Sequence, residues 1–214
     1  MKEGHPSYEV TYREIHSRDY QALGEIIVDT WRFGDISSDP RTVAHFGCSY
    51  LLTSLLHQTY HQAAFVDGKP AGIIISADQK KKRMHMKYLL QMLLHGFPML
   101  LDKDLKERNR HWEGYHEKTE ELLSQAGVPF DAELTLFIVD RRYRGLGIGR
   151  HLYEGLMEFY RKQQVKTFYL QTDTGCDYEF YEHQGLKLLA QCKTGYSYAG
   201  VTDITMFLYG GEVK

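Results

Sequence analysis

The clearest signal in the sequence is the run Val139-Asp140-Arg141-Arg142-Tyr143-Arg144-Gly145-Leu146-Gly147-Ile148-Gly149-Arg150. It continues the apolar segment Glu133-Leu134-Thr135-Leu136-Phe137-Ile138-Val139, whose composition is typical of a strand buried on both faces. After it, apolar residues recur at the spacing of one helix face, at Ile148, Leu152, Leu156 and Phe159. The sequence therefore predicts a buried strand that passes through a basic, glycine-rich turn into a helix. A second, parallel strand is predicted at residues 167–171.

A turn of this kind is suited to binding an anion. Glycines let the main chain curl so that successive N–H groups point at one phosphate, and the following helix adds its positive N-terminal end. A Rossmann site fits less well, because the spacing is Gly-x-Gly-x-Gly and no acidic residue ends a second strand about twenty residues on. The missing Gly-Lys-Ser/Thr excludes a Walker loop. The alternative that the glycines serve only close packing of strand and helix stays open.

Two motifs resemble those of the GNAT superfamily of N-acetyltransferases. Arg144, Gly147 and Gly149 match the signature Arg/Gln-x-x-Gly-x-Gly/Ala at a strand-to-helix turn. Further on, Phe180-Tyr181-Glu182-His183-Gln184-Gly185-Leu186 resembles the family's Phe-Tyr-x-x-x-Gly-Phe, with Leu186 in place of the usual aromatic residue. The element order resembles the whole domain, whereas specific residues match only from about Glu133 to Leu186.

The resemblance implies that acetyl-CoA is the donor substrate and that no metal takes part. Main-chain amides of the turn would hold the pyrophosphate, and the pantetheine arm would lie beside the preceding strand like an extra strand. Thr174 stands where family members often carry asparagine. The residues expected to bind the cofactor are Phe137, Ile138, Val139, Arg144, Gly145, Leu146, Gly147, Ile148, Gly149, Arg150 and Thr174.

The resemblance also implies how protons move. Tyr181 is expected to protonate the departing CoA thiolate, the alternative being that it only packs and binds the cofactor. Glu133 is expected to be the base, directly or through water, the alternative being a solvated surface group. Cys176 is a less attractive nucleophile, because it lacks an evident basic partner and direct transfer needs no covalent intermediate.

The acceptor is expected to lie against loops that form the acceptor pocket in the family. The predicted substrate-binding residues are Trp31, Phe33, Asp35, Tyr196 and Tyr198. The alternative is that the aromatic residues among them only cover the hydrophobic core and bind no substrate. The overall hypothesis is transfer of acetyl to a primary amine of a small molecule or peptide by direct attack. The alternative is a CoA-binding regulatory or interaction module that has lost catalysis.

The predicted fold class is α/β, a GNAT-like twisted mixed β-sheet flanked by helices, forming a single N-acetyltransferase (GNAT) domain over residues 1–214. A strand at about 8–14 and helices ending near Trp31 and spanning about 41–61 precede a hairpin turned at Asp67-Gly68. A helical insertion at about 78–129 precedes the cofactor-binding strand and is expected to cover the acceptor side. Its stripe Met86, Leu90, Leu93 and Phe97 is expected to pack in the core, with contact to a membrane or partner as the alternative.

Composition limits the remaining possibilities. The chain of 214 residues is 43% hydrophobic with a net charge of -2, which argues for one core and against general binding to nucleic acid. The uncharged stretch from Thr42 to Val66 carries too many polar side chains to cross a bilayer. Cys48, Cys176 and Cys192 are too widely spaced to suggest a disulfide framework or a zinc site. The N-terminus lacks the apolar segment of a secretory signal. A cytoplasmic protein that binds no membrane is expected, and a homodimer is left open.

Overall fold

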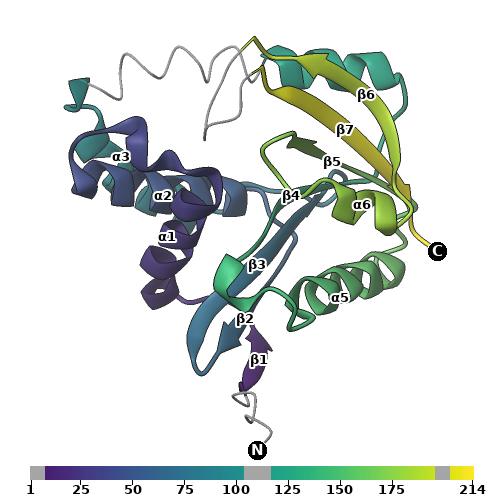
Figure 1. The fold of residues 1–214 in the computed structure, drawn as a ribbon. Helices are drawn as coiled ribbons and strands as arrows, with labels where there is room; N and C mark the ends of the chain where they lie inside the picture. Colours follow the sequence, from purple (N-terminus) through teal and green to yellow (C-terminus); the bar gives the residue numbers. More distant parts are fainter. Residues whose placement is uncertain (1–7, 104–116, 196–202) are drawn as a thin grey trace, which may run out of the picture.

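The described residues form one mixed sheet of seven strands (Figure 1). The computed structural model describes residues 8–103, 117–195 and 203–214. The strands are β1 (Val10–Arg13), β2 (Tyr60–Val66), β3 (Lys69–Asp78), β4 (Ala132–Val139), β5 (Thr167–Asp173), β6 (Lys187–Lys193) and β7 (Thr205–Glu212). In the sheet they follow the order β1-β2-β3-β4-β5-β7-β6, and β4 and β5 are the parallel pair among antiparallel neighbours. The predicted mixed sheet with a parallel crossover is confirmed.

Helices cover both faces of this sheet (Figure 1). They are α1 (Tyr20–Trp31), α2 (Pro40–Leu55), α3 (Met86–Met99), α5 (Ile148–Lys162) and α6 (Glu179–His183), with 3-10 turns η1 (Ser17–Asp19), η2 (Phe33–Ile36) and η3 (Arg141–Tyr143). Residues 117–126 are also helical. In β3, Ile73 and Ile75 join the core beneath α1 and α2, whereas Ile74 joins the core beneath α5. This alternation gives the sheet two buried faces, as expected for a central strand.

Helices α1 and α2 pack closely at a pair of glycines. A Cβ atom added to Gly47 would meet the backbone of Gly24 and the side chain of Val28, and one added to Gly24 would meet the backbone of Gly47 and Cys48. The two helices therefore approach to backbone contact at this point. That approach fixes the end of α1, which carries Trp31.

A bulge in β4 positions the site. Ile75 pairs with Leu136 and Ser76 with Leu134, so Thr135 is an extra residue on β4. Residues two apart on a regular strand point to the same face, but here the extra residue reverses this. Leu134 packs in the core beneath α5, whereas Leu136 packs in the core beneath α1 and α2. Pairing with β5 also stops at Leu134. The two parallel strands therefore separate at the bulge, as bulges commonly cause.

The predicted helix at about 41–61 is too long. It ends at Leu55, and Tyr60 and His61 already pair with Ser76 and Ile75 as part of β2. The residues after Leu56 include His, Thr and Tyr, which favour a helix weakly, so pairing with the sheet decides their structure. The hairpin at Asp67-Gly68 is confirmed, since both residues have positive φ, as a tight two-residue turn requires.

The prediction that Met86, Leu90, Leu93 and Phe97 pack in the core is wrong. Their side chains are 62%, 62%, 60% and 68% exposed. Helix α3 instead buries Tyr88 and packs Met92 against the core beneath α1 and α2. Both faces of α3 are apolar, so periodicity alone does not decide which face is buried. Among the described residues, no helix is both long and apolar enough to span a membrane.

Candidate active site

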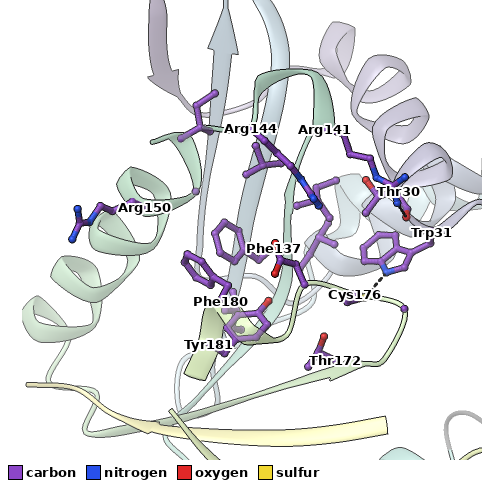
Figure 2. A pocket seen from close by; sticks show the side chains of 18 of the residues that line it. Thr30, Trp31, Phe137, Arg141, Arg144, Arg150, Thr172, Cys176, Phe180 and Tyr181 are labelled. Carbon is purple, nitrogen blue, oxygen red and sulfur yellow. Dashed lines mark hydrogen bonds between the residues drawn. The ribbon is translucent and has the colours of Figure 1, made fainter. Parts of the chain in front are cut away.

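A cavity of about 570 Å³ opens where β4 and β5 separate (Figure 2). Residues 134–139 form one wall, and residues 135–139 pair with no residue of β5. This edge of β4 therefore has main-chain N–H and C=O groups without ladder partners from β5, and such groups can pair with an amide-bearing ligand. The other walls come from the turn before α5, the ends of α1 and β5, one residue of α2, and α6.

The turn before α5 forms an N–H cradle at one end of the cavity. Gly145 and Gly147 have φ values of 83° and 74°, and a Cβ atom at either position would meet no atom within 4 Å. The backbone there is exposed and left-handed, which glycine adopts without strain. Helix α5 begins at Ile148, so the N–H groups of its first turn lack helical acceptors and point toward the cavity end. An anion such as a pyrophosphate fits this cradle.

The arginines near the cradle have distinct partners. Arg142 donates to Asp140 from its main-chain N–H at 2.9 Å and from Nε at 2.9 Å. Burial raises the pKa of Asp140, but these hydrogen bonds outweigh burial and leave the pKa lowered. Arg141 donates to the carbonyl of Thr30 at 3.2 Å, and Arg150 pairs with Glu154 at 3.3 Å. In Figure 2 the Arg144 side chain extends over the cavity, whereas Arg150 points away from it and contributes main chain.

Helix α6 presents Tyr181 to the middle of the cavity. The ring of Phe180 packs edge-on against Phe137 at 5.4 Å and Tyr153 at 5.7 Å, which fixes α6 against β4 and α5. Tyr181 lines the cavity from this anchored helix. Burial raises its pKa, and the nearby Cys176 and Asp177 raise it further. The phenol is therefore a neutral O–H donor at physiological pH.

The opposite end of the cavity is aromatic and acidic. Trp31 Nε1–H donates to Cys176 Sγ at 3.1 Å, and Tyr50 lines the same end (Figure 2). Asp173, at the end of β5, lines the cavity and is only 4% exposed. Burial, followed by the charge of Asp173, raises the pKa of the Cys176 thiol to about 11. This thiol is protonated near neutral pH, which disfavours a role as nucleophile.

Most of the predicted donor-site residues line the cavity. They are Phe137, Ile138, Val139, Arg144, Gly145, Gly147, Ile148, Gly149 and Arg150, joined by Tyr181 and Trp31. Leu146 is 40% exposed beside the cavity and does not line it. Thr174 does not line it either, because its hydroxyl accepts from the main-chain N–H of Thr205 at 3.2 Å.

The remaining predicted residues lie elsewhere. Phe33 is buried beneath α2, with its ring 5.1 Å from Phe46, so it supports the wall behind Trp31. Asp35 lies in η2, and its side chain is not described. Tyr196 and Tyr198 lie outside the described residues.

Glu133 lies near the start of β4, next to the cavity wall but outside the lining. Burial raises its pKa, and hydrogen bonds with Tyr169 and Gln79 oppose that rise. The carboxyl is thus a partly buried group of raised pKa, unlike the solvated surface group that was the alternative.

Sequence reasoning missed several residues at the aromatic and acidic end of the cavity. Thr30, Tyr50, Gln171 and Asp173 line the cavity but belong to no recognised motif. Asp173 carried a usable signal, because ligands bind outside the carboxyl ends of parallel strands and Asp173 ends β5. Tyr50 carried none, since a tyrosine within a helix is most often a packing residue. No group of three or more His, Cys, Asp or Glu is placed to hold a metal ion within the described ranges.

Comparisons with known proteins were made for both the sequence and the fold. No curated protein matches the chain in sequence. A putative acetyltransferase of the GNAT family from Desulfovibrio desulfuricans has a TM-score of 0.57 at 14% identity, covering 96% of this chain and 100% of that chain. The ribosomal-protein-S18-alanine N-acetyltransferase from Escherichia coli also has a TM-score of 0.57 at 14% identity, with 96% and 95% covered.

An aminoglycoside 6′-N-acetyltransferase complexed with coenzyme A has a TM-score of 0.55 at 14% identity, over 95% of this chain and 97% of that chain. These similarities support the fold alone. The family model described as the acetyltransferase (GNAT) family matches residues 20–186, which run from the start of α1 past α6 and include every wall of the cavity. The chain belongs to the acetyltransferase (GNAT) family.

Proposed function

We propose that the protein transfers the acetyl group of acetyl-CoA to a primary amine. The observation that carries this proposal is the continuity of one cavity. It runs from the N–H cradle at Gly145 and Gly147, along the open edge of β4, to Tyr181 and the acidic end at Asp173. A phosphate site, an amide-pairing edge, a neutral proton donor and a carboxylate thus lie on one path.

The residues of the donor half have separable roles. The N–H groups of residues 145–150 bind the pyrophosphate, and the main chain of residues 135–139 pairs with the pantetheine amides. Acetyl-CoA, when bound, supplies an activated thioester. An N–H at the end of β4 would donate to the thioester carbonyl oxygen, which stabilises the charge that develops there. Tyr181 O–H donates a proton to the departing sulfur.

The acceptor half favours a cationic amine. Asp173 supplies a buried carboxylate, and the rings of Trp31 and Tyr50 line the same end of the cavity. A carboxylate attracts an ammonium group, and aromatic faces stabilise cations further. Neighbours of similar fold are named as acting on an alanine of a ribosomal protein and on an aminoglycoside, both of which carry amines. We therefore propose an amine-bearing small molecule or peptide as the acceptor.

The test is a panel of primary amines and peptides with acetyl-CoA, followed by detection of free CoA thiol. Amine-dependent release of thiol, with the mass of the acetylated product, is the expected result. Tight binding of CoA with no amine-dependent release across the panel would instead support a CoA-binding regulatory module. Failure to bind CoA at all would contradict both hypotheses.

Two carboxyl groups lie near enough to the site to compete for the role of base. We propose Glu133 acting through water, because burial raises the pKa of its carboxyl and so makes the carboxylate a stronger proton acceptor. Asp173 is the competing carboxylate, because it lines the cavity itself. Glu133→Gln should remove the acidic limb of the kcat/KM profile with a found acceptor. If Asp173→Asn removes that limb instead, Asp173 is the base.

A further inference from the structure

Helix α3 has two apolar faces, and only one of them is covered. The inner face carries Tyr88, 1% exposed, and Met92, which contacts Thr53 Oγ1 at 3.2 Å. His95 on the same face lies 3.1 Å from His45 of α2. The outer face is about half a turn away, since 3.6 residues make one turn. It carries large apolar side chains that the described structure leaves exposed.

We define this outer face as the α3 apolar face. Its members are Met86 (62% exposed), Leu90 (62%), Leu93 (60%), Leu94 (67%) and Phe97 (68%), continued by Leu100 (64%) and Leu101 (77%). They recur at the three- and four-residue spacing of one helix stripe. Single exposed leucines are ordinary, whereas a contiguous stripe of this size marks an interaction surface.

Charge indicates what covers this face. Residues 79–101 include Lys80, Lys81, Lys82, Arg83 and Lys87 and contain no Asp or Glu, although the whole chain has a net charge of -2. The basic residues lie in the turn that leads into α3 and in its first turn. The apolar stripe therefore has a strongly basic border at its N-terminal end.

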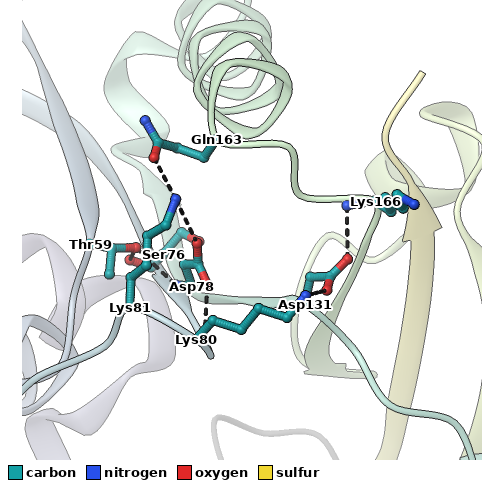
Figure 3. Close-up of polar contacts among 8 residues, drawn as sticks. All are labelled: Thr59, Ser76, Asp78, Lys80, Lys81, Asp131, Gln163 and Lys166. Atoms are coloured by element: carbon teal, nitrogen blue, oxygen red, sulfur yellow. Dashed lines mark hydrogen bonds and ion pairs between the residues drawn. The ribbon is translucent and has the colours of Figure 1, made fainter.

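The basic turn is held in place by two of its own lysines (Figure 3). Lys80 Nζ donates to Asp131 at 2.6 Å, and Lys81 Nζ donates to Gln163 at 2.7 Å and pairs with Asp78 at 3.7 Å. Lys82 and Arg83 are exposed in the turn that leads into α3. Two lysines thus anchor the turn, and Lys87 lies against the inner face, because its Nζ is 4.5 Å from the centre of the Tyr88 ring.

We propose, against the expectation from the sequence that the protein binds no membrane, that the α3 apolar face docks onto an anionic lipid surface, with Lys82 and Arg83 at the headgroup level. An interfacial helix of this kind inserts an apolar face into the boundary between headgroups and acyl chains, and basic residues beside it are attracted to anionic lipid. Nucleic acid offers no counterpart to a stripe of Leu, Met and Phe. A second copy of this chain brings the same basic border and no acidic residue within 79–101. An anionic lipid surface can contact both the α3 apolar face, through its acyl chains, and the basic residues beside it, through its headgroups.

The experiment measures co-sedimentation of the full chain with vesicles of phosphatidylcholine, with and without phosphatidylserine. We expect binding that requires phosphatidylserine and weakens as salt is raised. Lys82→Ala/Arg83→Ala should lower partitioning by about fivefold per charge removed. Leu93→Ser/Phe97→Ser should lower it at least tenfold, since two large apolar groups are lost from the interface.

A matched control removes exposed apolar side chains elsewhere. Val128 and Leu188 are 53% and 46% exposed and lie outside the α3 apolar face, so Val128→Ser/Leu188→Ser should bind vesicles like the wild type. All variants should keep the wild-type thermal unfolding midpoint, because the replaced side chains are exposed. Absence of vesicle binding, equal binding to neutral vesicles, or equal loss in the control would overturn the proposal. A wild-type dimer that Leu93→Ser/Phe97→Ser dissociates, with no vesicle binding, would assign the face to a second copy.

Discussion

Gly147 and Gly68 have nearly the same positive φ angle in two different places. Their φ values are 74° and 77°, and a Cβ atom at either would meet nothing within 4 Å. Gly147 caps α5 in the N–H cradle, whereas Gly68 lies in the hairpin between β2 and β3. Substitutions at these two glycines therefore cause the same backbone strain, but only the one at Gly147 lies where CoA is proposed to bind.

Gly147→Ala should weaken binding of CoA at least tenfold, which corresponds to about 1.4 kcal/mol. The left-handed backbone costs alanine about 1–2 kcal/mol, so the turn shifts and its N–H groups lose their alignment. Calorimetric titration measures the effect. Gly68→Ala bears the same strain and should bind CoA like the wild type. Equal weakening in both variants, or in neither, would contradict the cradle assignment.

Tyr181→Phe should lower kcat on the order of 10²-fold, with little change in the Kd of acetyl-CoA. The substitution keeps the ring and removes only the O–H that we assign to the leaving thiolate. Steady-state kinetics with a found acceptor provides the measurement. Tyr178 packs its ring 4.9 Å from Phe207 and does not line the cavity, so Tyr178→Phe should keep full turnover. If Tyr181→Phe stays within about twofold of wild type, Tyr181 is a packing residue.

Cys176 should react slowly with iodoacetamide at pH 8. Raising its pKa from 9.0 to about 11 lowers the thiolate fraction about 100-fold. Because the folded-state pKa is the higher one, the associated stability is present below pH 9 and is lost as pH rises from 9 to 11. Peptide mass spectrometry can follow Cys192 as the control, because that thiol does not line the cavity. Acetyl-CoA should slow the reaction of Cys176 further and leave Cys192 unchanged; faster labelling of Cys176 than Cys192 would contradict this account.

At the scale of elements, the contact between α1 and α2 sets the position of Trp31. Gly47→Ala places a methyl group against the backbone of Gly24, where neither helix can move without disturbing the core. We expect a loss of about 1–3 kcal/mol in the free energy of unfolding, measured with urea. Gly34→Ala, whose Cβ would meet nothing within 4 Å, should change it by less than half as much. An equal effect at both sites would mean that close helix packing is not the cause.

Local pattern predicted the elements whose structure depends on their own sequence. The segment from β4 through α5 to β5 carries strand, turn and helix signals in order, and its observed bounds agree with the prediction to within a few residues. The end of α2 and the buried face of α3 depend on distant partners. Pairing with β3 converts Tyr60 and His61 to strand, and packing on α2 selects Tyr88 over Leu90 as the buried side chain of α3.

The bulge at Thr135 left no trace in the sequence pattern. Apart from Thr135 itself, the run from Leu134 to Val139 is apolar on both faces, so an exchange of faces within it does not produce a recognisable change in the alternation of side-chain types. The family resemblance implied a free strand edge at this place, because it puts the pantetheine arm beside the strand like an extra strand. The structure adds its physical origin, because pairing ends next to the extra residue.

At the scale of the whole molecule, the two halves of the site differ in how far sequence could predict them. The donor half is one continuous stretch, residues 134–150, and its motif identified it directly. The acceptor half joins Trp31 of α1, Tyr50 of α2, and Asp173 and Cys176 at the end of β5. Residues this far apart in the chain are brought together only by the packing of helices on the sheet. Sequence therefore predicted Trp31 from its loop but neither Tyr50 nor Asp173.

The insertion at 78–129 connects to both sides of the acceptor half. Ser37 donates to Asp102 at 2.6 Å, and Thr119 donates to Gln171 of the cavity wall at 3.1 Å. Within the described residues the insertion does not line the cavity itself. We retain the proposal that it shapes the acceptor side, since Thr119 contacts Gln171, which lines the cavity. Its exposed helix α3 gives it a second, separate surface.

The most direct test of the central claim is a crystal structure of the protein with acetyl-CoA bound. We predict the pyrophosphate within hydrogen-bonding distance of main-chain N–H groups in residues 145–150, and the pantetheine amides paired with residues 135–139. The thioester should then lie next to Tyr181, between the cradle and Asp173. Acetyl-CoA bound at any other surface, or a complex in which the edge of β4 beyond Leu134 stays unpaired, would contradict the account.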